Sequence, residues 1–315
     1  PQAIRTAVPE ELYSTSYIAE CAVAWLEGQR DDDQPFFLMV SFPDPHHPFN
    51  PPGRYWGMYD PADMETPAAF EANGWQPPAH VASVLQQRDD GTANLKAMGA
   101  IGTSAQEARE AQALTCGMIS MIDAAVGTVR GALEQSGQAG DTVEIFTTDH
   151  GDHLGDHRLL FKGSEQYEQI TRVPFIWADP DGETGQRRDD IGQTHDIGTS
   201  ILARAELAPP HGMQGRDLFS DPPRDAAFIQ YAHQKPMDGI GHSPIVHTLR
   251  DARYRLSVHD AMDWGELYDL QEDPGEFRNL WSDAGHAPVK AQLLEALVRA
   301  EIAHTDRVPL PTGRA

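Results

Sequence analysis

The sequence predicts an α/β protein in which a mostly parallel sheet is flanked by helices, followed by a small C-terminal α+β subdomain with an antiparallel sheet. A continuous apolar run of strand length, typical of a strand covered on both faces, occurs at 35–42, and shorter runs at 143–146 and 173–177 have the pattern of buried strands. A helical pattern over 107–135, then a glycine-rich turn, then an apolar strand is the αβ unit of a parallel sheet. From Arg224 the pattern changes to alternating strands, so we expect one domain over 1–223 and the subdomain over 224–315.

The composition narrows the classes of function. A chain of 315 residues is long enough to bury a sizeable core. Its net charge of -24 argues against a surface for nucleic acid or for an anionic membrane, because both need clustered Lys and Arg. No apolar run reaches the roughly 18 residues of a membrane span, and no leader pattern opens the sequence. We therefore expect a soluble protein with no membrane span, whose compartment is unknown.

The first elements lead to a pair of histidines. An amphipathic helix is expected over 14–28, with Cys21 on its buried face, and a strand over 35–42 follows. The loop PDPHHPFNPP after this strand is kept extended by its prolines and contains His46 and His47. A histidine is more often structural, but ligands of open α/β sheets bind outside the carboxyl ends of strands, which favours a functional role here.

The middle of the chain combines an irregular excursion with a long helix. Residues 60–105 are rich in Pro, Asp, Gly and Gln, which predicts a long loop with short helices that could shape a substrate entrance. Apolar residues recur every three or four positions over 107–135, which predicts a long amphipathic helix, or a broken pair of helices, that contains Cys116. We expect both cysteines to be buried thiols, and two cysteines do not make a disulfide scaffold.

The stretch VEIFTTDHGDHLGDHRLLFKG, residues 143–163, carries a dense set of polar side chains after a strand. The strand leads to Asp149 and His150, Gly151 frees the backbone to turn, and Lys162 follows. A carboxylate and an imidazole that bind a divalent cation, backed by an ammonium group, suit an anionic tetrahedral substrate. The alternative is turn chemistry, with Asp149 accepting backbone N–H bonds and Gly151 supplying a positive φ. We assign no metal role to the histidines farther along the loop, His153 and His157.

The C-terminal part of the chain predicts an α+β arrangement. A helix is expected over 195–207, and strands with a tight turn near Asp251 follow. A β-turn at 273–275 and a closing helix over 291–303 complete the subdomain.

Several of these motifs, in this order, resemble those of type I sulfatases, the formylglycine-dependent branch of the alkaline phosphatase superfamily. TTDHGDHLGDHRLLFKG is similar to their second metal-binding segment, and PHHPF at 45–49 is similar to their Pro-His-x-Pro-Phe motif. GMQGRDL and ELYDLQEDPGEFRNL resemble the family's later junction and C-terminal signature. The resemblance implies an alkaline-phosphatase-like, mostly parallel sheet, of which this chain carries the later portion and which is therefore incomplete.

The resemblance also implies roles for particular residues. Asp149 and His150 would ligate a divalent metal, which is calcium in a sulfatase, or manganese or zinc if the protein is a phosphonate hydrolase. Lys162 would contact the sulfate group and the nucleophile. His46 would donate to the sulfate or to the leaving oxygen, while His47 occupies a variable position. The implied reaction is metal-dependent cleavage of a sulfate ester of a small molecule or a saccharide.

Part of the sulfatase machinery is expected to be missing from these residues. The family's nucleophile is made from Cys or Ser within Cys/Ser-x-Pro-x-Arg, but Cys21 lies in CAVAW and Cys116 in CGMIS. We expect no serine to fit either, and we expect the three aspartates at 31–33 to form a solvated turn that does not replace the family's early Asp-Asp pair. The chain alone should therefore bind metal weakly and lack sulfatase activity, as a truncated portion of a longer protein.

Two other interpretations stay open. Phosphonate or phosphate ester hydrolases of the same superfamily share the Asp-His-Gly segment and the lysine. Alternatively, the chain is a non-catalytic fragment or partner subunit that binds a missing N-terminal half, which would cover an otherwise exposed apolar edge. The choice of substrate alcohol is expected to depend on the loops at 60–105 and 233–247.

Overall fold

The computed structural model describes residues 3–29, 34–72, 74–93, 99–232, 243–260 and 262–306, so the predicted turn at 31–33 and most of the loop at 233–247 lie outside the described residues. The chain divides into two compact units. Unit 1 comprises Pro1–Glu71, Val84–Lys162 and Gln169–Gly185, and unit 2 comprises Ala72–Ser83, Gly163–Glu168 and Gln186–Ala315. The combination of helices and sheets confirms the α/β class.

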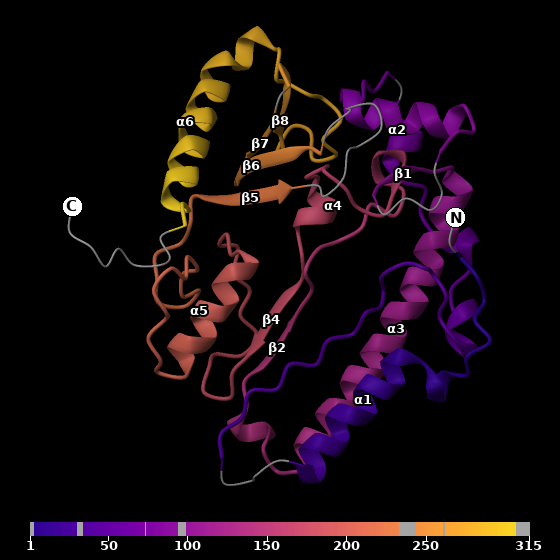
Figure 1. Cartoon of the computed structure of the whole chain (residues 1–315), viewed down its shortest axis with the longest axis vertical. Helices are drawn as coiled ribbons and strands as arrows, with labels where there is room; N and C mark the ends of the chain where they lie inside the picture. The colour runs from indigo at the N-terminus through magenta and orange to yellow at the C-terminus, as the bar shows by residue number, and fades with distance from the viewer. Residues whose placement is uncertain are drawn as a thin grey trace. The chain divides into compact units, whose positions relative to one another are not determined.

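Two long helices form the framework of unit 1 and lie side by side (Figure 1). Helix α1 (Ser14–Ala24) continues into a π-helical turn, η2 (Trp25–Gln29). Its buried residues are spaced by three or four positions, as expected for an amphipathic helix: Thr15, Ala19, Ala22 and Leu26. Cys21 lies one position off this stripe and is exposed, so the prediction of a buried thiol is wrong there, and Cys116 is only partly buried.

Helix α3 (Ala105–Gln135) begins at a capping box, two residues before its predicted start. The side chain of Ser104 accepts from the N–H of Glu107, and the Glu107 carboxylate accepts from the N–H of Ser104 at 2.9 Å. Among the helices that the structure describes, α3 is the one long and apolar enough to cross a membrane by composition alone. Its buried face packs against Phe49, Ile101 and Leu160, as the face of a core helix does.

The other described helices of the chain, apart from α5 and α6, are short, in agreement with the prediction for 60–105. The ones between the proline-rich loop and α3 are η3 (Gly53–Gly57), η4 (Pro61–Asp63), η5 (Ala68–Phe70) and α2 (Ala79–Asp89). The others are η1 (Glu10–Leu12), η6 (Ala139–Asp141), η7 (Asp156–Arg158), α4 (Glu168–Thr171) and η8 (Ala284–His286).

The described strands of unit 1 pair antiparallel, whereas the sequence predicts a mostly parallel sheet. β1 (Ile101–Gly102) pairs with β3 (Leu159–Leu160), and β2 (Glu144–Thr147) pairs with β4 (Phe175–Ala178). The chain between β2 and β4 contains the strand β3 and, as its helices, only the short η7 and α4. Parallel neighbours are usually joined by a longer crossover helix, and this connection has none.

The apolar strand runs of unit 1 carry exposed side chains, so the prediction that they are buried strands is wrong. The run at 35–42 is extended but joins no described ladder. Phe36 and Leu38 pack against the cluster that contains Leu26 and Leu133, and the alternate side chains face away from it. The exposed fractions are 71% for Phe37, 75% for Met39, 43% for Phe146, 39% for Phe175 and 58% for Ile176. The described residues thus leave this apolar surface without a covering layer.

Unit 2 is built on an antiparallel meander, as predicted for the chain after Arg224. Its four strands follow one another as β5 (Ala226–Ala232), β6 (Ile245–Asp251), β7 (Tyr254–His259) and β8 (Gly265–Asp269). Helix α6 (Ala287–Ala303) packs against this sheet through Leu293 and Leu297 (Figure 1). The predicted β-turn is confirmed, because the N–H of Glu276 donates to the carbonyl of Asp273 at 3.0 Å.

Helix α5 (Thr194–Arg204) belongs to unit 2, although the sequence analysis places it in the first domain. Its N-cap residue, Gln193, donates from its side chain to the carbonyl of Phe228 in β5 at 2.7 Å and accepts from the N–H of Phe228 at 3.3 Å. A bridge also joins Ile191 to Arg224. Because of these bonds to β5, the last boundary between the two units lies earlier in the sequence than expected.

The contact between α3 and η3 requires glycine at position 117. A Cβ there would lie 2.3 Å from the carbonyl oxygen of Tyr55. Alanine is normally about 1 kcal/mol more favourable than glycine inside a helix. Here Gly117→Ala should instead lower the free energy of unfolding by about 1–3 kcal/mol, because one backbone must move away from the other. Urea denaturation of the purified variant measures the change.

The same helix provides matched controls for this prediction. Gly127 and Gly131 have nothing within 4 Å of the position of a Cβ. Gly127→Ala and Gly131→Ala should leave the free energy of unfolding unchanged or raise it, by up to about 1 kcal/mol. If Gly117→Ala behaved like these two variants, the close approach of α3 to η3 would be wrong.

Candidate active site

The end of β2 brings a carboxylate and an imidazole to one place. The backbone N–H of His150 donates to Oδ1 of Asp149 at 2.9 Å, and Nδ1 of His150 lies 2.8 Å from the carbonyl oxygen of Gly151. Because a carbonyl only accepts, Nδ1 carries the ring proton, and Nε2 of the neutral ring keeps its lone pair. This Nε2 lies 3.5 Å from Oδ2 of Asp149. His150 is thus held in the tautomer that can ligate a metal.

Gly151 is required by space and not by a positive φ. Its φ is outside the left-handed region, so that part of the turn interpretation is wrong. Its N–H donates to the carbonyl of Ile170 at 2.9 Å, and a Cβ would lie 1.9 Å from the carbonyl oxygen of Gln169. The other part of the turn interpretation is confirmed, since Asp149 does accept a backbone N–H bond. The segment that follows β2 therefore runs directly against the backbone of α4.

The loop between this pair and Lys162 has a strained backbone. Four of its non-glycine residues have φ in the left-handed region, which favours glycine: Leu154 at 48°, His157 at 53°, Arg158 at 57° and Phe161 at 68°. Backbone bonds hold the loop in this conformation, from the N–H of His153 to Phe161 and from the N–H of Thr103 to Arg158, both at 2.8 Å. Such strain persists only where the surroundings fix the conformation, and it is concentrated at functional sites.

Lys162 leaves this loop with its amino group buried. Within the described part of the chain, Nζ has no hydrogen-bond partner. Burial lowers the pKa of Lys162, and the carboxylates of Asp152 and Asp149 counteract this in part. A compact positive charge without a partner at a half-buried position is suited to binding an anion.

A stack of rings orients His46. Its Nδ1 lies 2.6 Å from the carbonyl oxygen of His47 and therefore carries a proton. The ring of His46 stacks on that of His47 with centroids 4.2 Å apart, and the His47 ring lies 4.0 Å from Phe161, the residue before Lys162. Phe161 in turn stacks with Phe49 at 6.0 Å. The stack joins the two motif segments that the sequence analysis singled out.

Asp152 lies among these groups, and the sequence analysis assigned it no role. Burial raises the pKa of Asp152, and positive charge on Lys162, His150 and His46 counteracts the rise. Its Oδ1 is buried without a hydrogen-bond partner in the described residues. Three of the predicted site residues thus act on one carboxylate, and Asp149 acts on Lys162. The only sequence signal for Asp152 is its place in the repeated Asp-His pattern of this stretch.

One serine does fit the sequence pattern of the nucleophile motif, so the expectation that no serine fits it is wrong. Residues 220–224 read SDPPR. Arg224 donates to the carboxylate of Asp196, and these side chains are 7% and 1% exposed. Ser220 donates from Oγ to the carboxylate of Asp217. Both ends of the pentapeptide are thus bonded within unit 2, which indicates a structural role.

The Asp149–His150 pair fits one divalent ion without completing its coordination. Two ligand atoms on one zinc ion lie about 3.4 Å apart, which is close to the 3.5 Å between Nε2 and Oδ2. Calcium takes about six or more oxygens, so further ligands must join these two. In the residues that the structure describes, the one group of three metal-ligating side chains close to one another lies in unit 2, at His80, His259 and Glu266.

Comparisons with known proteins give related matches over most of the chain. The Sulfatase family model matches residues 4–207, and the model of the C-terminal part of N-sulphoglucosamine sulphohydrolase matches 155–303. The chain is 28% identical to the multifunctional alkaline phosphatase superfamily protein PehA of Trinickia caryophylli, over 95% of this chain and 62% of that protein. It is 30% identical to an arylsulfatase of Clostridium perfringens, over 86% of this chain and 54% of that protein.

A solved structure supports the same relationship. The phosphonate monoester hydrolase of Agrobacterium radiobacter is similar with a TM-score of 0.80 and 26% identity, over 97% of this chain and 64% of that one. This confirms the alkaline-phosphatase-like fold class. The chain spans 54% to 62% of the length of the two curated relatives named above.

The position of His47 in the ring stack predicts a pH dependence of stability. Burial, with the charges of His46 and Lys162, lowers the pKa of His47 to about 4. An unfolded histidine titrates near pH 6.5, so between about pH 6.5 and 4 the unfolded chain binds a proton that the folded chain does not. This contribution to stability should be complete above pH 6.5 and lost as the pH falls to 4. Its size is on the order of 3 kcal/mol.

Urea denaturation at several pH values between 7 and 4 tests this prediction. His47→Gln should make the free energy of unfolding fall less steeply over this range, because glutamine does not titrate. His211→Gln, which changes an exposed histidine of unit 2, should leave the steepness unchanged. If the two variants fell as steeply as one another, a group other than His47 would carry the pH dependence.

Proposed function

Because this chain belongs to the sulfatase family, we propose that it carries the metal-binding and leaving-group side of an active site that hydrolyses sulfate esters. The observation that supports this best concerns the ammonium group of Lys162, which has no hydrogen-bond partner in the described part of the chain and is acted on by the charge of Asp149 in the Asp149–His150 pair. A cation site beside a positive charge that lacks a partner suits a tetrahedral anion better than a neutral substrate.

Each side chain has a distinct task in this proposal. A divalent ion, when bound, neutralises sulfate oxygens and activates the sulfur for attack. Asp149 and His150 hold that ion through Oδ2 and Nε2. Lys162 contacts a sulfate oxygen, where its charge stabilises the anionic transition state. Asp152 raises the pKa of the Lys162 amine and so helps to keep it protonated.

His46 donates a proton to the leaving oxygen. Because its Nδ1 already donates to the carbonyl of His47, Nε2 can donate only when the ring is an imidazolium. After the transfer the ring is the neutral Nδ1–H tautomer, and its bond to His47 is unchanged. The ring therefore keeps the same orientation in both protonation states. This suits a general acid, which must stay within hydrogen-bond reach of the leaving oxygen.

The nucleophile is not among the side chains of this site. The family resemblance implies a formylglycine, and neither Cys21 nor Cys116 has the motif from which it is made. Ser220 has the spacing but is bonded to Asp217 in unit 2. We therefore propose that residues 1–315 hydrolyse a sulfate ester only when another segment provides the nucleophile.

A phosphonate ester is the second candidate substrate. Calcium prefers oxygen ligands, whereas an imidazole suits zinc, so the orientation of His150 Nε2 towards Asp149 favours zinc, one of the ions expected of a phosphonate hydrolase. The similarity to the phosphonate monoester hydrolase of Agrobacterium radiobacter points the same way. Rates on matched aryl sulfate and aryl phosphonate esters, with calcium, manganese and zinc in turn, distinguish the two.

A role as a partner subunit is supported by the uncovered apolar surface of unit 1. Phe37, Met39 and Ile176 are each more than half exposed, and such an apolar surface marks an interaction site or a liability for aggregation. An additional segment or a partner chain that covers these side chains would remove the liability. Association or aggregation of the isolated residues 1–315 in size-exclusion chromatography would favour this interpretation over a self-sufficient monomer.

Metal binding by residues 1–315 should depend on the end of β2. Asp149→Asn and His150→Ala should each weaken the binding of Mn²⁺ in calorimetric titration at least tenfold, because each removes one of only two protein ligands. The wild-type affinity should itself be weak, with a Kd near the millimolar range, since coordination is incomplete. His211→Asn is the control and should bind as the wild type does. Equal binding by Asp149→Asn and the wild type would contradict the site.

The role of His46 predicts a dependence on the leaving group. In a form of the enzyme that turns over, His46→Gln should lower kcat for an alkyl sulfate by about 10²–10⁴-fold, the usual size of a general acid's contribution. A p-nitrophenyl sulfate should lose far less, because its leaving oxygen needs no proton. If both esters lost activity equally, His46 would bind the sulfate group and would not protonate the leaving oxygen.

A further inference from the structure

A second group of ligand-type side chains is buried in unit 2, apart from the residues of the candidate active site. His80 lies in α2, His259 ends β7 and Glu266 lies in β8. None of the three is more than 3% exposed. Nε2 of His259 lies 3.0 Å from Oε1 of Glu266, and Nε2 of His80 lies 3.9 Å from the same oxygen. One potential ligand atom from each residue lies within 4.8 Å of the others.

His80 is the member that a hydrogen-bonded network does not explain. Neither of its ring nitrogens has a hydrogen-bond partner in the described residues. A neutral imidazole always carries one N–H, so a buried donor and a buried acceptor are both left over, which is costly. Whichever nitrogen of the neutral ring carries the proton, the other has a free lone pair. No described residue offers a partner for that lone pair.

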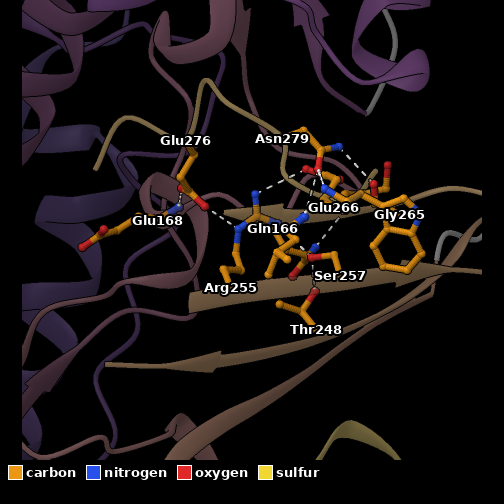
Figure 2. A network of polar contacts seen from close by, with 12 residues as sticks. Gln166, Glu168, Thr248, Arg255, Ser257, Gly265, Glu266, Glu276 and Asn279 are labelled. Carbon is orange, nitrogen blue, oxygen red and sulfur yellow. Dashed lines mark hydrogen bonds and ion pairs between the residues drawn. The ribbon is translucent and has the colours of Figure 1, made fainter. Parts of the chain in front are cut away.

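The carboxylate is fixed with one oxygen towards the two histidines. Figure 2 shows Arg255 between Glu266 and Glu276. Its Nη2 lies 3.3 Å from Oε2 of Glu266, and its Nη1 donates to Ser257 at 2.8 Å (Figure 2). Oε2 is thereby occupied, while Oε1 faces His80 and His259. Metal-ligating carboxylates are commonly held in this way by a hydrogen bond to the oxygen that does not ligate.

Trp264 fixes the two imidazoles from the side. Its ring stacks on His80 with centroids 5.4 Å apart and planes 7° apart, and it lies 4.6 Å from the ring of His259. An apolar ring packed against both histidines limits their rotation and excludes water from that side. The residues thus form a rigid site of two nitrogens and one oxygen, which leaves the fourth position of a tetrahedral ion to a further ligand such as water.

We propose that His80, His259 and Glu266 bind a transition-metal ion, with zinc as the best fit, at a structural site that joins the 72–83 segment to β7 and β8. Two imidazoles and a carboxylate are a common zinc ligand set, and they disfavour calcium, which prefers oxygens. Ligand atoms on one zinc ion lie about 3.4 Å apart, and the two distances to Oε1, 3.0 and 3.9 Å, bracket this spacing. The alternative is a network without metal, in which His259, Glu266 and Arg255 satisfy one another and His80 is left over.

Titration of the metal-free chain with Zn²⁺ alone tests the proposal. The purified protein, stripped with a chelator, should take up one equivalent of zinc tightly, and its Tm should rise by about 5 °C at saturating metal. With Co²⁺ as the probe, the bound ion should show the d–d absorption of a four-coordinate site. No tight equivalent, or a cobalt spectrum of the hexaaqua ion, would overturn the proposal.

Two variants separate this site from the one at β2. His80→Gln should lose the tight zinc equivalent and the rise in Tm, while its Tm without metal stays close to that of the metal-free wild type, because His80 has no hydrogen bond to lose. The double variant Asp149→Asn, His150→Ala should keep both. Loss of the tight equivalent in the double variant, or its retention in His80→Gln, would overturn the proposal. If His80→Gln did not fold, His259→Gln would serve as the second test of the same site.

Discussion

The candidate active site depends on the position of the His47 ring between His46 and Phe161. The two segments that meet there lie far apart in the sequence, and neither is part of a long helix or strand at that point. The contact between rings therefore takes the place of regular secondary structure in fixing the distance between His46 and Lys162. Burial keeps the middle ring neutral, while His46 at the outer end of the stack is exposed to a substrate.

Much of the fold could be predicted from the sequence because its signals are local. The periodicity at 107–135 and 291–303 identified two helices, and the alternation after Arg224 identified the meander. Strand direction and burial at 143–146 could not be predicted in the same way, since both depend on which elements lie alongside. An apolar run looks the same whether its outer face is covered by a neighbour or, as for the described residues, is not.

The two candidate sites also differ in whether their residues are close together in the sequence. Asp149 and His150 were identifiable because adjacent residues at a strand end are necessarily close. His80, His259 and Glu266 have no common motif, and only the packing of α2 residues against the sheet of unit 2 brings them together. Net charge was equally uninformative about the site. Beyond about 10 Å the acidic surface is screened by salt, so the net charge says little about the field beside the Lys162 ammonium group.

Arg255 and Lys162, two described residues whose charged groups are buried, differ in how the positive charge is partnered. Arg255 is almost fully buried, and it is paired with Glu266 and Glu276 and lies over the rings of Tyr167 and Tyr268. Removing either carboxylate would leave the buried charge of Arg255 without the attraction that offsets its desolvation. A structural ion pair behaves in this way. Lys162 is also buried at its amino group, but two carboxylates act on it only at a distance and none bonds to it. Folding alone would not favour such a group. A buried ammonium group at this position is understandable if its partner is a substrate anion. The attraction that no carboxylate uses in the free protein is then available for binding that anion.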